Sequence, residues 1–126
     1  IPMPEVIHNI SLNEFKIALS NLSTDSMIIL RFTADWCAPC QKINDDCNNY
    51  FSTCNEKITP FVIDVEESLD LYATLKKYKM INGIPALLAY HGNAKQNPWF
   101  VPNDSIVGGS KENLLAFFMR CNNHIK

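Results

Sequence analysis

Two cysteines separated by two residues carry the strongest chemical signal in this chain. The segment Ala34-Asp35-Trp36-Cys37-Ala38-Pro39-Cys40 follows an apolar run and opens a stretch with helical character. A C-x-x-C pair placed between a strand and a helix is typical of a redox-active dithiol. The free N–H groups and the positive dipole end of the helix would stabilise a Cys37 thiolate, which is the attacking species in disulfide chemistry.

The spacing of this pair also suits a disulfide. Cys40 lies one helical turn after Cys37, so their Cα atoms are expected about 5–6 Å apart, within the range that a disulfide bridges. Pro39 falls in the first turn, where its missing N–H costs nothing. The predicted mechanism has two steps: the Cys37 thiolate attacks a substrate disulfide, and Cys40 then attacks Cys37, releases the reduced substrate and leaves the Cys37–Cys40 disulfide.

The same two cysteines could also serve a structural zinc site or remain inert. A structural zinc site needs four ligands, and the chain has neither a second C-x-x-C nor a closely spaced histidine pair, because His8, His91 and His124 are scattered. We therefore expect no metal and no other cofactor. A pair of inert buried thiols is the second alternative.

Hydrophobic periodicity and capping signals place the pair within alternating strands and helices. Strands are expected at Val6–Ile10, Met27–Phe32, Phe61–Val65, Ala86–Tyr90 and Ser105–Val107. Helices are expected at Ser11–Leu22, Cys37–Phe51 and Ser68–Tyr78, with a last helix capped by Ser110. This order predicts an α/β fold in which a central mixed β-sheet is flanked by helices on both faces.

The composition indicates one ordinary globular domain over residues 1–126, with 47% hydrophobic residues and a net charge of −2. This charge does not favour nucleic acid or an anionic membrane as a partner, and no apolar run approaches the ~20 residues of a membrane span. We expect a monomer. Residues 1–4 lack the basic and apolar regions of a signal peptide. Because the chain begins with Ile and not with Met, an upstream targeting segment remains an alternative.

Five cysteines cannot all pair within the chain, so a disulfide-stapled secreted domain is not expected. One special pair in a reducing compartment fits better, and we expect a cytoplasmic location. Cys47 is interpreted as a small buried hydrophobe on the same helix face as Cys40, about 10 Å away. Cys54 and Cys121 are interpreted as free thiols, with modification or an intermolecular disulfide as the alternative.

From about Ile10 to Cys121, the chain resembles the thioredoxin family. The resemblance rests on Trp36-Cys37-Ala38-Pro39-Cys40, on Gly83-Ile84-Pro85-Ala86 before the fourth strand, and on Gly108-Gly109 before the last helix. It implies a thioredoxin-like fold and a cis peptide bond before Pro85, next to the redox pair. It also implies that the backbone at Ile84 pairs with an extended substrate chain.

The same resemblance implies that Trp36 packs beside Cys37 and presents its ring to partners, the alternative being a core aromatic. The expected substrate-binding residues are Trp36, Ala38, Pro39, Ile84 and Pro85. Ala38 stands where the family usually has glycine, and this substitution changes the freedom of the turn only slightly.

A larger departure is Arg31, which stands where family members usually carry a buried Asp, six residues before the first cysteine. A guanidinium cannot act as a base. We expect Arg31 to reach a surface carboxylate such as Asp35, Asp64 or Glu66, since an unpaired buried arginine would be costly. If it instead approaches Cys40, it would favour the Cys40 thiolate and modulate the reaction.

A third departure is the long connection between Tyr90 and Ile106, which contains Trp99-Phe100-Val101. Exposed aromatic residues there would mark a partner surface. The interpretation that we favour is that they cover the sheet edge or the core. His91 is interpreted as a turn residue, and Lys76, Lys77 and Lys79 as a solvated helix end.

These observations predict an oxidoreductase that reduces protein disulfides and is recharged by a thioredoxin-reductase-type protein or another thiol donor. Its potential is expected between ~−270 and ~−200 mV. The alternative is a binding or scaffold module that holds a partner at Pro85 or at the Trp99 segment. A third alternative is an oxidant or isomerase of a secretory compartment.

Overall fold

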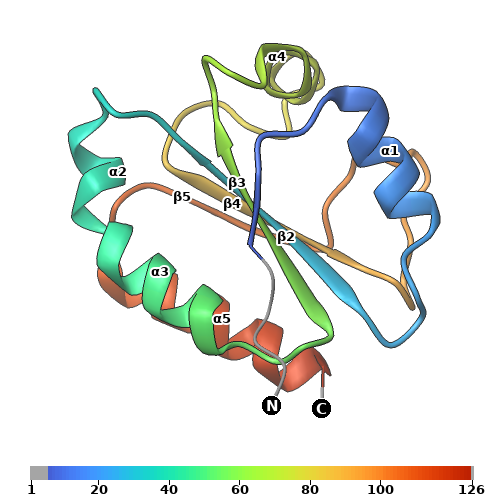
Figure 1. The fold of residues 1–126 in the computed structure, drawn as a ribbon. Helices are drawn as coiled ribbons and strands as arrows, with labels where there is room; N and C mark the ends of the chain where they lie inside the picture. Colours follow the sequence, from blue (N-terminus) through green and yellow to red (C-terminus); the bar gives the residue numbers. More distant parts are fainter. Residues whose placement is uncertain (1–5, 126) are drawn as a thin grey trace.

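The computed structural model describes residues 6–125, whose centre is a mixed five-stranded sheet (Figure 1). The strands are β1 (Ile7–His8), β2 (Met27–Thr33), β3 (Ile58–Asp64), β4 (Ala86–His91) and β5 (Asp104–Val107). They lie in the order β1-β3-β2-β4-β5. The β1, β3 and β2 strands are parallel, whereas β4 runs antiparallel to both β2 and β5. The predicted mixed sheet is therefore present, and β5 is the predicted hairpin partner of β4.

Helices cover both faces of this sheet, as predicted. Helices α1 (Leu12–Ser20) and α4 (Leu69–Lys77) lie on one face, and α3 (Asn44–Thr53) and α5 (Lys111–Ile125) on the other, with the short α2 (Ala38–Lys42) leading into α3 (Figure 1). Side chains from β2 alternate between the two cores: Ile28 and Leu30 pack with α1 and α4, and Met27 and Ile29 with α3 and α5. Burial on both sides explains the continuous apolar run of β2.

Polar caps start the first and last helices where the sequence predicts. The Ser11 hydroxyl accepts the Glu14 backbone N–H at 3.1 Å, and the Glu14 carboxylate accepts the Ser11 N–H at 2.8 Å. This reciprocal capping box satisfies two N–H groups that would otherwise lack partners. The Ser110 hydroxyl likewise accepts the Asn113 N–H at 3.2 Å.

The prediction of one helix over Cys37–Phe51 is wrong. The helix is interrupted at Ile43, whose φ of −100° and ψ of 6° separate α2 from α3. In the turn before this interruption, the Cys40 carbonyl accepts a hydrogen bond from the Arg31 side chain. Cys40 and Cys47 consequently lie on different helices, and the expectation of a shared helix face does not hold.

The strand predicted to start at Phe61 begins three residues earlier, at Ile58, and includes Pro60. Within the described residues, β1 pairs with β3 only at Phe61 and Val62, so the β1 side of β3 is unpaired at Pro60. A proline is tolerated at such an edge because its missing N–H removes no ladder bond.

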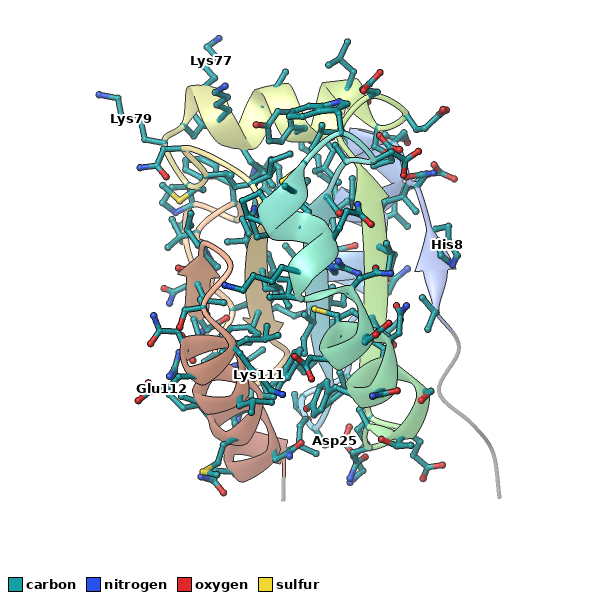
Figure 2. All side chains as sticks on the ribbon, turned by 90° about the vertical axis from the view of Figure 1, so that its left-hand side faces the viewer. His8, Asp25, Lys77, Lys79, Lys111 and Glu112 are labelled. Carbon is teal, nitrogen blue, oxygen red and sulfur yellow. A yellow bond between two sulfur atoms is a disulfide. The ribbon has the colours of Figure 1, made fainter. Side chains whose placement is uncertain are left out.

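The aromatic residues of the long connection cover the core, which confirms the interpretation favoured from the sequence. Trp99 packs against Phe15 of α1 with ring centroids 6.2 Å apart. Phe100 stacks on Tyr78, with ring centroids 4.3 Å apart. The lysines in the last turn of α4 and just after it are exposed as predicted, and Lys77 and Lys79 project away from the fold in Figure 2. Over residues 6–125, no helix has the length and apolar character needed to cross a bilayer.

His91 was predicted to be a turn residue, but it is the last residue of β4 and stacks on His124 of α5. Their ring centroids lie 3.6 Å apart. Burial, followed by the charge of the neighbouring His124 ring, lowers the pKa of His91 from 6.5 to about 4. The folded chain therefore keeps His91 neutral at pH values where the unfolded chain protonates it.

We expect the His91→Phe variant, which keeps a stacking ring, to be less sensitive to acid than the wild type. The stabilisation from neutral His91 is fully present above pH 6.5 and is lost as the pH falls towards 4, because the unfolded state then binds the extra proton. Urea unfolding at pH 7.5 and 4.5 should show a loss of about 2 kcal/mol in the wild type that the variant lacks. His8→Phe is the control, because His8 is exposed on β1 (Figure 2). An equal acid loss in wild type and His91→Phe would contradict the prediction.

Candidate active site

A disulfide joins Cys37 and Cys40 at the start of α2, with a Cα–Cα distance of 5.2 Å. Cys37 is the N-cap residue of α2, and its Sγ accepts the Cys40 backbone N–H at 3.2 Å. Pro39 lies in the first turn of the helix. The structure thus brings together the predicted spacing, the predicted position at a helix start and a hydrogen-bond donor to the Cys37 sulfur.

The two sulfur-bearing residues differ in their accessibility. The exposed fraction is 6% for Cys37 and 0% for Cys40. The neighbouring Ala38 and Pro39 are exposed. The Cys37 side of the pair therefore lies at the surface, whereas Cys40 is enclosed by the fold.

Backbone and side-chain bonds fix the segment that carries the pair. The Cys37 N–H donates to the Ala34 carbonyl at 3.2 Å, and Gln41 Nε2 donates to the same carbonyl at 3.0 Å. The Gln41 N–H in turn donates to the Cys37 carbonyl at 3.1 Å. Gln41 was not singled out from the sequence, where its only signal is an amide side chain directly after the second cysteine.

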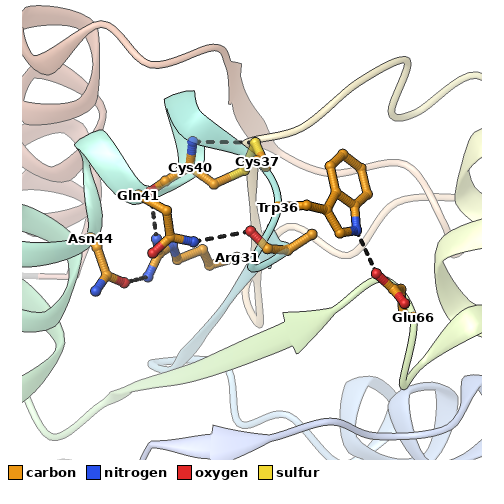
Figure 3. The surroundings of a disulfide bond; sticks show 8 residues. Arg31, Trp36, Cys37, Cys40, Gln41, Asn44 and Glu66 are labelled. Carbon is orange, nitrogen blue, oxygen red and sulfur yellow. Dashed lines mark hydrogen bonds between the residues drawn. A yellow bond between two sulfur atoms is a disulfide. The ribbon is translucent and has the colours of Figure 1, made fainter.

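Trp36 is exposed rather than part of the core, with 68% of its surface accessible. Its indole N–H donates to the carboxylate of Glu66, in the segment that follows β3 (Figure 3). This bond holds an exposed aromatic ring beside Cys37, in the place that the resemblance implied. The role of Glu66 was missed from the sequence because the two residues are distant in the chain.

The peptide bond between Ile84 and Pro85 is cis, as the resemblance implied. Pro85 precedes β4, and Ala86 pairs with Phe32 at the end of β2 from which the chain continues to Cys37. Pro85 therefore lies at the same end of the sheet as the cysteine pair.

The two glycines before α5 join this site. The Gly108 N–H donates to the Pro85 carbonyl at 2.9 Å, and Gly108 has a φ of +105°. At Gly109, a Cβ atom would lie 3.2 Å from both Cβ and the carbonyl oxygen of Pro39, so the missing side chain permits this close approach. The three sequence motifs thus meet at one place.

Arg31 does not reach a surface carboxylate, so that prediction is wrong. Its side chain is 1% exposed and lies beneath the cysteine pair (Figure 3). Nη2 donates to the Cys40 carbonyl at 3.1 Å, and Nη1 donates to the Asn44 side-chain oxygen at 3.1 Å. The reason is geometric: a residue in the middle of β2 that faces α3 meets these helix groups before it could reach the surface.

The other cysteines are free and buried in the core between the sheet and helices α3 and α5. Burial raises the pKa of Cys47 and of Cys54 to about 11, and that of Cys121 to about 12. The interpretation of Cys47 as a small buried hydrophobe is confirmed. Within residues 6–125, no three His, Cys, Asp or Glu side chains gather as a metal site would require.

Comparison with solved structures supports the fold. A thioredoxin from Malassezia sympodialis matches with a TM-score of 0.70 and 21% identity, covering 95% of this chain and 93% of that one. A thioredoxin from Fasciola hepatica matches with a TM-score of 0.70 and 15% identity, covering 90% of this chain and 97% of that one. The thioredoxin-like fold predicted from the motifs is therefore confirmed.

Sequence comparison supports the family. A curated thioredoxin from Ictalurus punctatus is 34% identical over 67 residues, which are 52% of this chain. The match spans 62% of the length of that relative. The thioredoxin family model matches residues 6–120. The family model matches most of the chain, and the three motifs meet around a bonded Cys37–Cys40 pair. The chain therefore belongs to the thioredoxin family.

Proposed function

We propose that this chain is a thiol–disulfide oxidoreductase that reduces protein disulfides through Cys37 and Cys40. The observation that carries the proposal is the Cys37 sulfur at the start of α2, bonded to Cys40 and accepting the Cys40 N–H. Family membership and a cysteine pair at bonding distance fit this class of enzyme. The N–H donor and the helix dipole favour a thiolate at Cys37 in the reduced form.

In the proposed cycle, the Cys37 thiolate attacks one sulfur of a substrate disulfide, and the other substrate sulfur leaves as a thiolate that takes a proton from water. Cys40 then attacks Cys37 in the mixed disulfide, so that the second substrate sulfur leaves and the Cys37–Cys40 bond forms. A reductase of the thioredoxin-reductase type, or another thiol donor, reduces this bond again.

Protein substrates would dock on the exposed residues around Cys37. The exposed Trp36, Ala38 and Pro39 offer an apolar surface, and the half-buried Ile84, which precedes the buried Pro85, offers its backbone. An extended substrate segment that pairs with the Ile84 backbone would bring its disulfide to Cys37 rather than to the enclosed Cys40.

Insulin reduction by dithiothreitol tests the proposal. The wild type should accelerate precipitation of the insulin B chain, and Cys37→Ser should reduce the rate to that of dithiothreitol alone, because no nucleophile remains at the accessible position. Cys54→Ala is the matched control, since it removes a buried thiol that lies outside the pair. It should keep the wild-type rate.

If neither the wild type nor Cys54→Ala accelerates the reaction, the chain is a binding module instead. In that case the cysteine pair would serve structure rather than turnover.

A further inference from the structure

Arg31 carries a buried positive charge that has no anionic partner in the described chain. No carboxylate of residues 6–125 lies within 4.0 Å of its guanidinium, whose bonds go to the neutral oxygens of Cys40 and Asn44. Its Nε atom is buried and has no hydrogen-bond partner at all. Removing a charge from water without pairing it costs several kcal/mol, so this arrangement calls for a compensating interaction.

The groups around Arg31 leave few candidates for that interaction. Arg31 borders a cavity of about 610 Å³ that is also lined by His8, Asp35 and Asp64. Of these three residues, His8 and Asp35 are exposed, and Asp64 is half-buried on β3. The buried titratable group on α3 is Cys47, and burial keeps its thiol protonated at neutral pH. Arg31 itself keeps its proton, although burial lowers its pKa.

The remaining candidate is Cys40, whose own carbonyl Arg31 touches. In the oxidised pair the Cys40 sulfur is bonded and uncharged. When the pair opens, this sulfur becomes an ionisable group on the residue whose carbonyl Arg31 contacts, and Cys40 is 0% exposed to water.

We propose that Arg31 is a positioning residue whose counter-ion is the Cys40 thiolate that forms when the disulfide opens. The proposal rests on the oxidoreductase function proposed above. In the resolving step, Cys40 loses its proton to water and its thiolate attacks the Cys37 sulfur of the mixed disulfide. The bond from Cys37 to the substrate breaks, and the substrate sulfur leaves with the electron pair and takes up a proton.

This arrangement sets a direction for the redox equilibrium. The oxidised form holds an unpaired buried cation, whereas the reduced form can hold a cation next to a thiolate. Arg31 therefore favours the reduced form and raises the midpoint potential of the pair. It also lowers the pKa of the Cys40 thiol, which increases the thiolate fraction available for the resolving step.

The first measurement is the midpoint potential of the full chain in glutathione buffers. Arg31→Met removes the charge and keeps an unbranched side chain, and it should shift the equilibrium towards the disulfide by about tenfold, or about 30 mV. Arg31→Lys keeps the charge and should stay close to the wild type. Arg120→Met is the matched control, because it removes an equal charge from an exposed arginine on α5 that pairs with Asp104.

The second measurement isolates Cys40. In a Cys37→Ser background, the ultraviolet absorbance of the thiolate at neutral to mildly alkaline pH reports the ionisation of Cys40, since burial raises the pKa of Cys47 and Cys54 to about 11 and that of Cys121 to about 12. Adding Arg31→Met should lower the acid dissociation constant of Cys40 about tenfold, and Arg31→Lys should restore it.

Three outcomes would overturn the inference: an unchanged potential in Arg31→Met, an equal shift in Arg31→Lys, or a shift that disappears when Cys47 is replaced by alanine. The last outcome would assign the interaction to Cys47. Insulin reduction that still depends on Cys37 would show in each case that the proposed function survives. If Arg31→Met fails to fold, Arg31→Gln replaces it as the variant without a charge. The ionisation of Cys40 is then compared between Arg31→Lys and Arg31→Gln, and an equal ionisation in the two would overturn the inference.

Discussion

Replacing Cys40 with serine should trap the protein in covalent complexes with its substrates. Cys37 remains the accessible thiol, so it can still attack a substrate disulfide, but no second sulfur lies within reach to release the product. The next cysteine along the chain, Cys47, is buried on α3, and burial raises the pKa of its thiol to about 11, so it stays protonated at neutral pH. We expect turnover to fall to the background rate and most of the protein to migrate as a mixed disulfide on non-reducing gels.

Cys37→Ser is the matched control for this experiment, because it leaves the enclosed thiol in place and removes the accessible one. Cys37→Ser should form few complexes. Dithiothreitol should reduce the mixed disulfides of Cys40→Ser and release the bound substrates. Complexes that accumulate on Cys37→Ser instead would show that Cys40 is the attacking residue, against the order of accessibility in the structure.

Gly92→Ala should destabilise the fold by about 3 kcal/mol. Gly92 follows β4, and its N–H donates to the Ser26 carbonyl at 2.9 Å. A methyl group there would overlap the backbone carbonyl of Ser23, which no side-chain rearrangement can move away. The turn before β2 must shift, and the end of the β2–β4 ladder would shift with it. Urea unfolding followed by circular dichroism measures the loss.

Gly83→Ala provides the control, because no atom lies within 4 Å of the position that its Cβ would occupy. It should change the free energy of unfolding by less than about 0.5 kcal/mol. If Gly92→Ala unfolded at the same urea concentration as Gly83→Ala, the close approach between Gly92 and Ser23 would be refuted.

Elements that depend on neighbouring residues could be predicted from the sequence. The capping box at Ser11 and the continuous apolar run of β2 place a helix and a buried strand correctly. The position of Cys37 at a helix start follows from the same kind of signal. Each of these features depends on side chains within one or two turns of the same element, so the local order of residue types is sufficient.

Features that require two distant segments could not be predicted in this way. The interruption at Ile43 coincides with a bond from Arg31 of β2 to the Cys40 carbonyl, and the partners of Arg31 were wrongly expected among surface carboxylates. The stacking of His91 on His124 joins β4 to the end of α5. No local pattern encodes which strand residue will face which helix turn.

The sequence by itself determined the redox pair, the order of strands and helices apart from the break between α2 and α3, and the three motifs that mark the family. Only the tertiary structure decided that Gly109 lies against Pro39, that Trp36 is held by Glu66, and that a buried arginine lies under Cys40. The physical reason is the same in each case. Hydrogen bonds and close contacts between distant segments depend on how the layers pack, and packing is a property of the whole chain rather than of any stretch of it.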